Sequence, residues 1–316
     1  MTLVSDDLSW WPSIKSYNIS SYFAVAASAG VMYDWALTFG QEVELVWRQR
    51  WSLMTALYLG MRYLGIIYAV MLVQVGVPTI PVTDAVCYIN YIALDWMSVV
   101  VNAILGVIIT TRLHAMSQNS RKMLILLVVV FLAVSTFNGV VAIFFTRNTL
   151  AEAFILSGTY QCTIAYKGNA LLLDSLAWIL TTVWEVLALY LAAWIAVKHF
   201  RELRQQSAGG IIGDCFTVLM RTHMFYFASF VVVSCSNLAY IFSPISADTY
   251  SLKNQLYNGL LQIFMLVQMF VLGPHLILSV REYHAKVMAD SDSGAGIAII
   301  SIALQERAHM STSLSM

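Results

Sequence analysis

Three carboxylic acids lie inside long apolar stretches of the sequence, where a charged side chain is costly: Asp95, Asp174 and Glu185. On insertion scales a charge at the centre of a bilayer costs roughly 2.5–3.5 kcal/mol, so such a group needs a hydrogen-bond partner, a counter-charge or a ligand. Asp95 and Asp174 fall near the ends of their stretches. Either they face a shared cavity that receives a small cationic or polar ligand, or interfacial water solvates them. Glu185 is either a proton carrier or ligand contact, or a neutral hydrogen-bond partner between helices.

Two residues of opposite charge occupy the first two apolar stretches. Asp34 lies toward the end of the first stretch and Arg62 lies within the second. A short connection joins the two stretches, so antiparallel neighbouring helices would bring these side chains together. Two interpretations follow: a structural ion pair that locks the two helices, or a switch used in signalling.

Five histidines fall at or near the ends of apolar stretches: His114, His199, His223, His275 and His284. Some seven-span hydrolases hold zinc with inward-facing His and Asp residues at one membrane face, and His114, His223 and His275 are the candidates for such a site. Against a metal site, no two histidines have i, i+4 spacing and the sequence contains no His-Glu-x-x-His. The sequence therefore favours a protein without metal or cofactor, and a non-enzyme over an enzyme.

The composition is that of a membrane protein. Hydrophobic residues make up 59% of the chain and charged residues 11%, whereas soluble domains carry about 25% charged residues. The net charge is zero, which provides no overall basic surface for nucleic acid.

Seven apolar stretches each approach the roughly 20 residues that a helix needs to cross the hydrocarbon core. They cover about 19–40, 52–75, 90–111, 123–145, 171–197, 217–242 and 258–280. Backbone groups in lipid must be satisfied within their own segment, so helices are expected. We predict an all-α, integral membrane bundle of seven transmembrane helices over 19–281, with a short segment 1–18 before it and a disordered tail over 282–316.

The basic residues predict the orientation of the bundle. One set of connections, together with the tail, carries twelve Lys and Arg residues: Arg48, Arg50, Arg112, Arg121, Lys122, Lys198, Arg201, Arg204, Arg221, Arg281, Lys286 and Arg307. The other set, together with the N-terminal segment, carries four: Lys15, Arg147, Lys167 and Lys253. Cytoplasmic connections are the basic ones, which predicts an N-terminus outside and a cytoplasmic C-terminus, in either the plasma membrane or an endomembrane.

Two cysteines and one sequon fall on the predicted outer side. Cys87 and Cys162 lie in separate outer connections, where a disulfide persists in an oxidising compartment, and we expect a bridge rather than two free thiols. Asn18, in Asn-Ile-Ser, is the candidate glycosylation site, although it abuts the first span.

Three short stretches carry a family resemblance. The first runs from Tyr33-Asp34 through Glu42-Val43-Glu44-Leu45-Val46-Trp47 and Trp51 to Arg62-Tyr63; the others include Arg112 with His114, and Pro274 with Arg281. Together they resemble a large family of fungal, mainly basidiomycete, seven-span proteins classed only as a domain of unknown function. The resemblance implies the fold and topology and carries no mechanism. His275 stands where the resemblance leads us to expect Arg.

Familiar seven-helix classes lack their motifs here. No predicted span has a lysine in its interior to hold retinal, and Thr111-Arg112-Leu113 stands in place of the Asp-Arg-Tyr of rhodopsin-type receptors. Inverted repeats typical of transporters are absent from the sequence.

Three hypotheses about function remain. The first is a receptor-like sensor that binds a small extracellular ligand near Asp95 and Asp174 and contacts a cytoplasmic signalling partner through its basic inner connections. The second is a membrane-embedded enzyme or lipid-handling protein that uses the histidines or Glu185. The third is a structural membrane protein.

Overall fold

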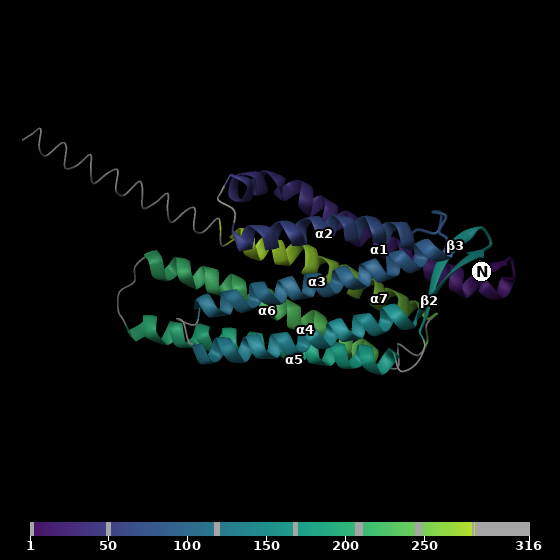
Figure 1. The fold of residues 1–316 in the computed structure, drawn as a ribbon. Coiled ribbons are helices and arrows are strands. Elements are labelled where there is room, and N and C mark those ends of the chain that lie inside the picture. Colours follow the sequence, from purple (N-terminus) through teal and green to yellow (C-terminus); the bar gives the residue numbers. More distant parts are fainter. Residues whose placement is uncertain are drawn as a thin grey trace, which may run out of the picture.

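The computed structural model describes residues 3–48, 52–116, 121–166, 170–205, 211–243, 248, 250–279 and 281. Within these ranges seven long helices lie side by side as a bundle (Figure 1). Their bounds are Trp11–Glu42 (α1), Leu53–Gly76 (α2), Asp84–Met116 (α3), Arg121–Asn148 (α4), Ala170–Gln205 (α5), Ile211–Ile241 (α6) and Leu252–Val267 (α7). A π-helical turn, Val43–Trp47, follows α1; another, Gln268–Leu272, follows α7 and leads into helix again over 273–279.

Among the described residues, six helices are long and apolar enough to cross a membrane. They are Leu53–Gly76, Asp84–His114, Met123–Asn148, Leu172–Lys198, Met224–Ile241 and Leu252–Ser279. This supports an integral, multi-pass, helical membrane protein. The helix α1, which contains the predicted first span, is long enough but is not one of the six, because its apolar residues are interrupted by serines, glycines and Asp34.

Local signals mark the helix ends, which hydropathy does not locate. Pro12 occupies the first turn of α1, where its missing N–H costs nothing. The helix α2 starts at a capping box in which Ser52 and Thr55 satisfy each other's backbone N–H groups. Hydropathy marks where a helix is apolar, whereas caps mark where it ends, so the observed helices extend past the predicted stretches.

A β-hairpin forms the connection between α4 and α5, for which the apolar pattern predicted no strand. Its strands are Thr149–Leu156 (β2) and Thr159–Tyr166 (β3), paired antiparallel, and the short strand Leu3–Ser5 (β1) adds parallel to β2. Ser157 and Gly158 both have positive φ, of 47° and 78°, as the tight turn of a two-residue hairpin requires. The strands lie at the same end of the bundle as the N-terminus (Figure 1).

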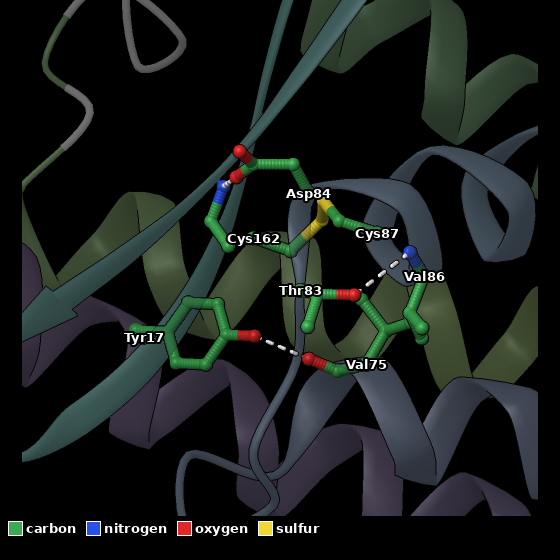
Figure 2. The surroundings of a disulfide bond; sticks show 8 residues. Tyr17, Val75, Thr83, Asp84, Val86, Cys87 and Cys162 are labelled. Carbon is green, nitrogen blue, oxygen red and sulfur yellow. Dashed lines mark hydrogen bonds between the residues drawn. A yellow bond between two sulfur atoms is a disulfide. The ribbon is translucent and has the colours of Figure 1, made fainter. Parts of the chain in front are cut away.

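A disulfide between Cys87 and Cys162 fastens this hairpin to the start of α3 (Figure 2). Beside it, the Asp84 carboxylate accepts a hydrogen bond of 2.8 Å from the backbone N–H of Ala153. The Tyr17 hydroxyl, on α1, donates to the backbone carbonyl of Val75 at the end of α2. The hairpin end therefore ties α1, α2, α3 and the sheet together.

Close helix contact depends on glycine at several positions, of which Gly259 is one. At Gly259, on α7, an added Cβ would overlap the ring of Phe23 on α1. A hydrogen at that position lets α7 approach α1 closely, and α1 packs on both α2 and α7.

Removing the disulfide should destabilise the protein. The bridge joins residues 75 positions apart, and loss of a native bridge costs about 2–5 kcal/mol because the unfolded chain regains the freedom of a long loop. We expect the double variant Cys87→Ser, Cys162→Ser to unfold at a lower temperature in detergent, measured by tryptophan fluorescence. Cys235→Ser, which removes an exposed free thiol, is the matched control. Equal melting temperatures for the double variant and the control would contradict the expectation.

Candidate functional site

Two groups of polar side chains lie inside the helix bundle. One, on α1, α2 and the helix after α7, surrounds Arg62 and is called here the Arg62 network. The other lines a cavity among α3, α4, α5, α6 and α7. They differ in hydrogen bonding. Most polar atoms of the Arg62 network have hydrogen-bond partners, whereas several polar atoms of the cavity wall have none among the described residues.

The guanidinium of Arg62 on α2 is 3% exposed and faces α1. Its Nη1 donates to the Asp34 carboxylate at 2.9 Å. Its Nη2 donates to the backbone carbonyl of Trp35 at 2.9 Å and to the hydroxyl of Thr38. The ion pair between Asp34 and Arg62 that we predicted from the sequence is present, and it is reinforced by backbone contacts that the sequence did not indicate.

A second carboxylate, Glu42, completes the charge arrangement. Glu42 is fully buried, and its Oε2 lies 3.4 Å from Nε of Arg62. Trp47 donates its indole N–H to Glu42 Oε1 at 3.0 Å, and the hydroxyls of Tyr58 and Tyr63 donate to the same carboxylate at 3.5 and 3.4 Å. A buried carboxylate is stable only with such donors, so the signature residues Trp47 and Tyr63 are explained by one shared acceptor.

The helix after α7 joins this network through two basic side chains. His275 Nε2 lies 2.8 Å from Asp34 Oδ1, the oxygen that Arg62 leaves free. Arg281 donates to the carbonyl of Leu45 at 2.8 Å and to the hydroxyl of Thr55 at 2.5 Å. His275 was a weak metal candidate in the sequence; in the structure it bonds a carboxylate that is already paired with Arg62.

The remaining signature residues lie elsewhere. Tyr33 is 67% exposed. Pro274 is buried directly after the π-helical turn. Arg112, near the end of α3, is half-buried, and its charge interacts with that of Arg281. Trp51 lies outside the described residues.

The second group lines a cavity of about 210 Å³ among α3–α7. All three acids that the sequence singled out reach it: Asp95 from α3, and Asp174 and Glu185 from α5. The π-helical turn contributes Gln268, and α6 contributes Ser234, which is hydrogen-bonded to the Glu185 carboxyl. Cavities that hold drug-sized molecules are roughly 300–1,000 Å³, so this one suits a smaller ligand.

Several polar atoms in the wall of this cavity have no hydrogen-bond partner among the described residues. Four are acceptors, and one is the indole N–H of Trp184; the acceptors are Asp95 Oδ2, Asn138 Oδ1, Glu185 Oε2 and Gln268 Oε1. Gln268 and Trp184 are only 8% and 6% exposed. Unsatisfied buried polar groups each cost about 1–3 kcal/mol. Their gathering around one cavity identifies it as the place where a ligand would gain most.

The other predicted sites have different outcomes. Among the described residues, no group of three or more His, Cys, Asp or Glu side chains is close enough to hold a metal ion. His114 lies near the end of α3, and the side chain of His223 lies outside the described residues. Asn18 is part of helix α1.

Comparison with known proteins gives a family match over part of the chain. Residues 22–67 match a family of unknown function (DUF6533). The matched segment runs from α1 through α2 and contains Asp34, Glu42 and Arg62, so the similarity covers the core of the Arg62 network. No curated protein matches the chain.

Breaking the Arg62 network should destabilise the fold strongly. Arg62→Met leaves two carboxylates without their shared cation, and removing one partner of a buried ion pair costs about 3–5 kcal/mol. The measurement is the thermal unfolding of the purified full chain in detergent. Arg147→Met, at an exposed position at the end of α4, is the control and should change little.

A compensating variant separates charge from packing. Adding Asp34→Asn and Glu42→Gln to Arg62→Met removes the uncompensated charges, so we expect part of the lost stability to return. An Arg62→Met chain as stable as the Arg147→Met control would show that the network does not hold the helices together.

Proposed function

We propose that this protein is a receptor-like membrane protein that binds a small ligand in the cavity among α3–α7. The observation that carries the proposal is the set of unpartnered polar atoms around that cavity, drawn from α3, α4, α5 and the π-helical turn. Stability alone would favour apolar or fully paired residues there. A site that binds a polar molecule requires such atoms to be available.

The proposal includes seven spans with the N-terminus outside. In support, α1 has 32 residues and presents exposed apolar side chains, among them Tyr22, Leu37 and Phe39, as a lipid-facing helix would. The excess of Lys and Arg on the other side supports a cytoplasmic C-terminus. The disulfide at the hairpin end agrees with an oxidising outer compartment, either at the plasma membrane or inside an endomembrane. The fungal origin implied by the sequence signature belongs to the same proposal.

A route from cavity to cytoplasm is provided by the last helix. Gln268 lines the cavity, and seven residues later His275 bonds Asp34 in the Arg62 network. Between them lie the π-helical turn and Pro274; π-turns and prolines are where helices bend and where functional sites often lie. A ligand that contacts Gln268 would shift this segment, and a signalling partner would read the change at the inner end.

The alternatives have less support. The histidines near the helix ends suggest an enzyme or lipid-handling role. One of them, His275, is already bonded to Asp34, which counts against that role. A structural role without a ligand would leave the unpartnered polar atoms of the cavity unexplained. The ligand-binding experiment below tests this alternative.

Filling the cavity should abolish ligand binding without unfolding the protein. Ala177→Phe, on the cavity wall of α5, occupies the space, whereas Val183→Phe, 58% exposed on the same helix and absent from the cavity wall, is the matched control. We expect compounds from a fragment collection to raise the melting temperature of the wild type and of Val183→Phe but not of Ala177→Phe. A ligand at 100 times its Kd stabilises by about 2.7 kcal/mol. Compounds that stabilise all three chains equally would place binding elsewhere, and the absence of any stabilising compound would favour the structural role.

Labelling of single cysteines in intact cells tests the topology. Asp6, Arg48 and Asp248 are exposed positions in three different connections and would be replaced by Cys one at a time, in a chain whose Cys215 and Cys235 are Ser. We expect a membrane-impermeant maleimide to label position 6 and position 248, and to label position 48 only after permeabilisation. Position 6 behaving like position 48 would show that α1 does not cross the membrane.

A further inference from the structure

The charge of the cavity wall indicates the chemical class of its ligand. Three of the residues that line it are carboxylic acids, and no Lys, Arg or His is among the described residues of the lining. The Asp95 and Asp174 side chains are close enough for their charges to interact. In a medium of low dielectric constant, two neighbouring carboxyl groups are both ionised only when a cation lies between them; otherwise one of them keeps its proton.

The hydrogen-bonding capacity of the wall points the same way. Among the described residues of the cavity wall, the unpartnered atoms are four acceptors and one donor, the Trp184 indole N–H. A carboxylate only accepts hydrogen bonds, and an ammonium group only donates them. A ligand that satisfies this wall must therefore bring mainly donors. The side-chain nitrogen of Asn138 already donates to Thr181 at 3.2 Å, which leaves its oxygen as the atom available to a ligand.

The remaining surface of the cavity is aromatic and aliphatic. Trp178, Phe131, Phe145 and Phe230 contribute to it, and the face of an aromatic ring attracts a cation through its quadrupole. Along α5, Asp174 and Glu185 are separated by eleven residues, or about 16 Å of helix. Among the described residues the acids do not gather closely enough for a metal ion, so the charges are distributed in a way that suits an organic cation.

We infer that the ligand of this cavity is a small organic amine, whose ammonium group is held between Asp95 and Asp174 while its carbon skeleton contacts the aromatic wall. The inference rests on the proposed function, because it assumes that the cavity is a ligand site. Ammonium-to-carboxylate hydrogen bonds are charge-assisted and roughly twice as strong as neutral ones. In this arrangement Asp95 and Asp174 recognise the charge, and Gln268 and Asn138 accept further donors.

Matched pairs of probes separate charge from shape. Three amines, namely butylamine, 2-phenylethylamine and 1,4-diaminobutane, are each compared with the alcohol of the same skeleton: 1-butanol, 2-phenylethanol and 1,4-butanediol. The full chain in lipid nanodiscs is titrated at pH 7, where the amines are charged. Binding is followed by the fluorescence of tryptophan, since Trp178 and Trp184 line the cavity, and by the melting temperature. We expect at least one amine to bind at least tenfold more tightly than its alcohol.

Variants identify the groups that recognise the charge. Asp95→Asn and Asp174→Asn should each reduce the amine preference at least tenfold, a change that corresponds to about 1.4 kcal/mol. Asp248→Asn, which removes an exposed aspartate outside the cavity, should preserve the preference. Amines that bind no better than their alcohols, or a preference that persists in the Asp95→Asn, Asp174→Asn double variant, would overturn the inference.

The Ala177→Phe variant distinguishes failure of the amine assignment from failure of the proposed ligand site. Probes that bind the wild type but not Ala177→Phe, with no preference for amines, would leave the ligand site standing and overturn only its assignment to amines. Probes that bind Ala177→Phe as tightly as the wild type would overturn both.

Discussion

The need to pair one buried guanidinium governs the arrangement of this bundle. Arg62 is almost completely removed from solvent, and a cation in that environment is stable only with counter-charges and acceptors close to it. Those acceptors lie on α1, at Asp34, Trp35, Thr38 and Glu42. The side chain therefore determines how α2 is rotated relative to α1. Because Asp34 also bonds His275, the same constraint holds the last helix against the first two.

A second clamp lies at the hairpin end. There the Cys87–Cys162 disulfide and the bond from Ala153 to Asp84 attach the β2–β3 hairpin to α3, and Tyr17 attaches α1 to the end of α2. Both clamps act on α1 and α2. The Arg62 network adds the helix after α7, while the hairpin end adds α3 and, through the strands, the ends of α4 and α5.

The contrast between the two polar groups supports the proposed ligand site. In the Arg62 network the Glu42 carboxylate has three hydrogen-bond donors and an arginine beside it. In the cavity, Asp95 and Glu185 each keep one oxygen without a partner among the described residues. The first arrangement is that of a structural lock, whose charges offset one another. The second leaves acidic groups and hydrogen-bond acceptors without partners among the described residues, and a bound cation would satisfy them. The π-helical turn with Gln268 and the following His275 connects them within one helix.

The sequence by itself determined that the protein lies in a lipid bilayer and which segments form helices. A long apolar stretch forms a helix in lipid, because its backbone groups must bond within the segment. The basic connections predict the orientation of the bundle in the membrane. It also selected the chemically important residues, since Asp34, Arg62, Asp95, Asp174 and Glu185 are costly in apolar stretches. The hairpin was within reach of the sequence too: Ser157-Gly158 between runs of β-branched and aromatic residues is a turn signal, which the apolar pattern of the neighbouring helices obscured.

Only the tertiary structure decided which of these residues meet. Glu42 lies in an ordinary polar segment of the sequence, and its burial against Arg62 arises because the π-helical turn after α1 brings Trp47 back over it. His275 is separated from Asp34 by 241 positions, so no local pattern relates them. Likewise, Asp95, Asp174, Glu185 and Gln268 come from three segments, and their convergence on one cavity depends on how each helix is rotated about its axis. Hydropathy reports whether a helix is apolar, but rotation is set by side-chain packing between helices, which is information that no single stretch of sequence contains.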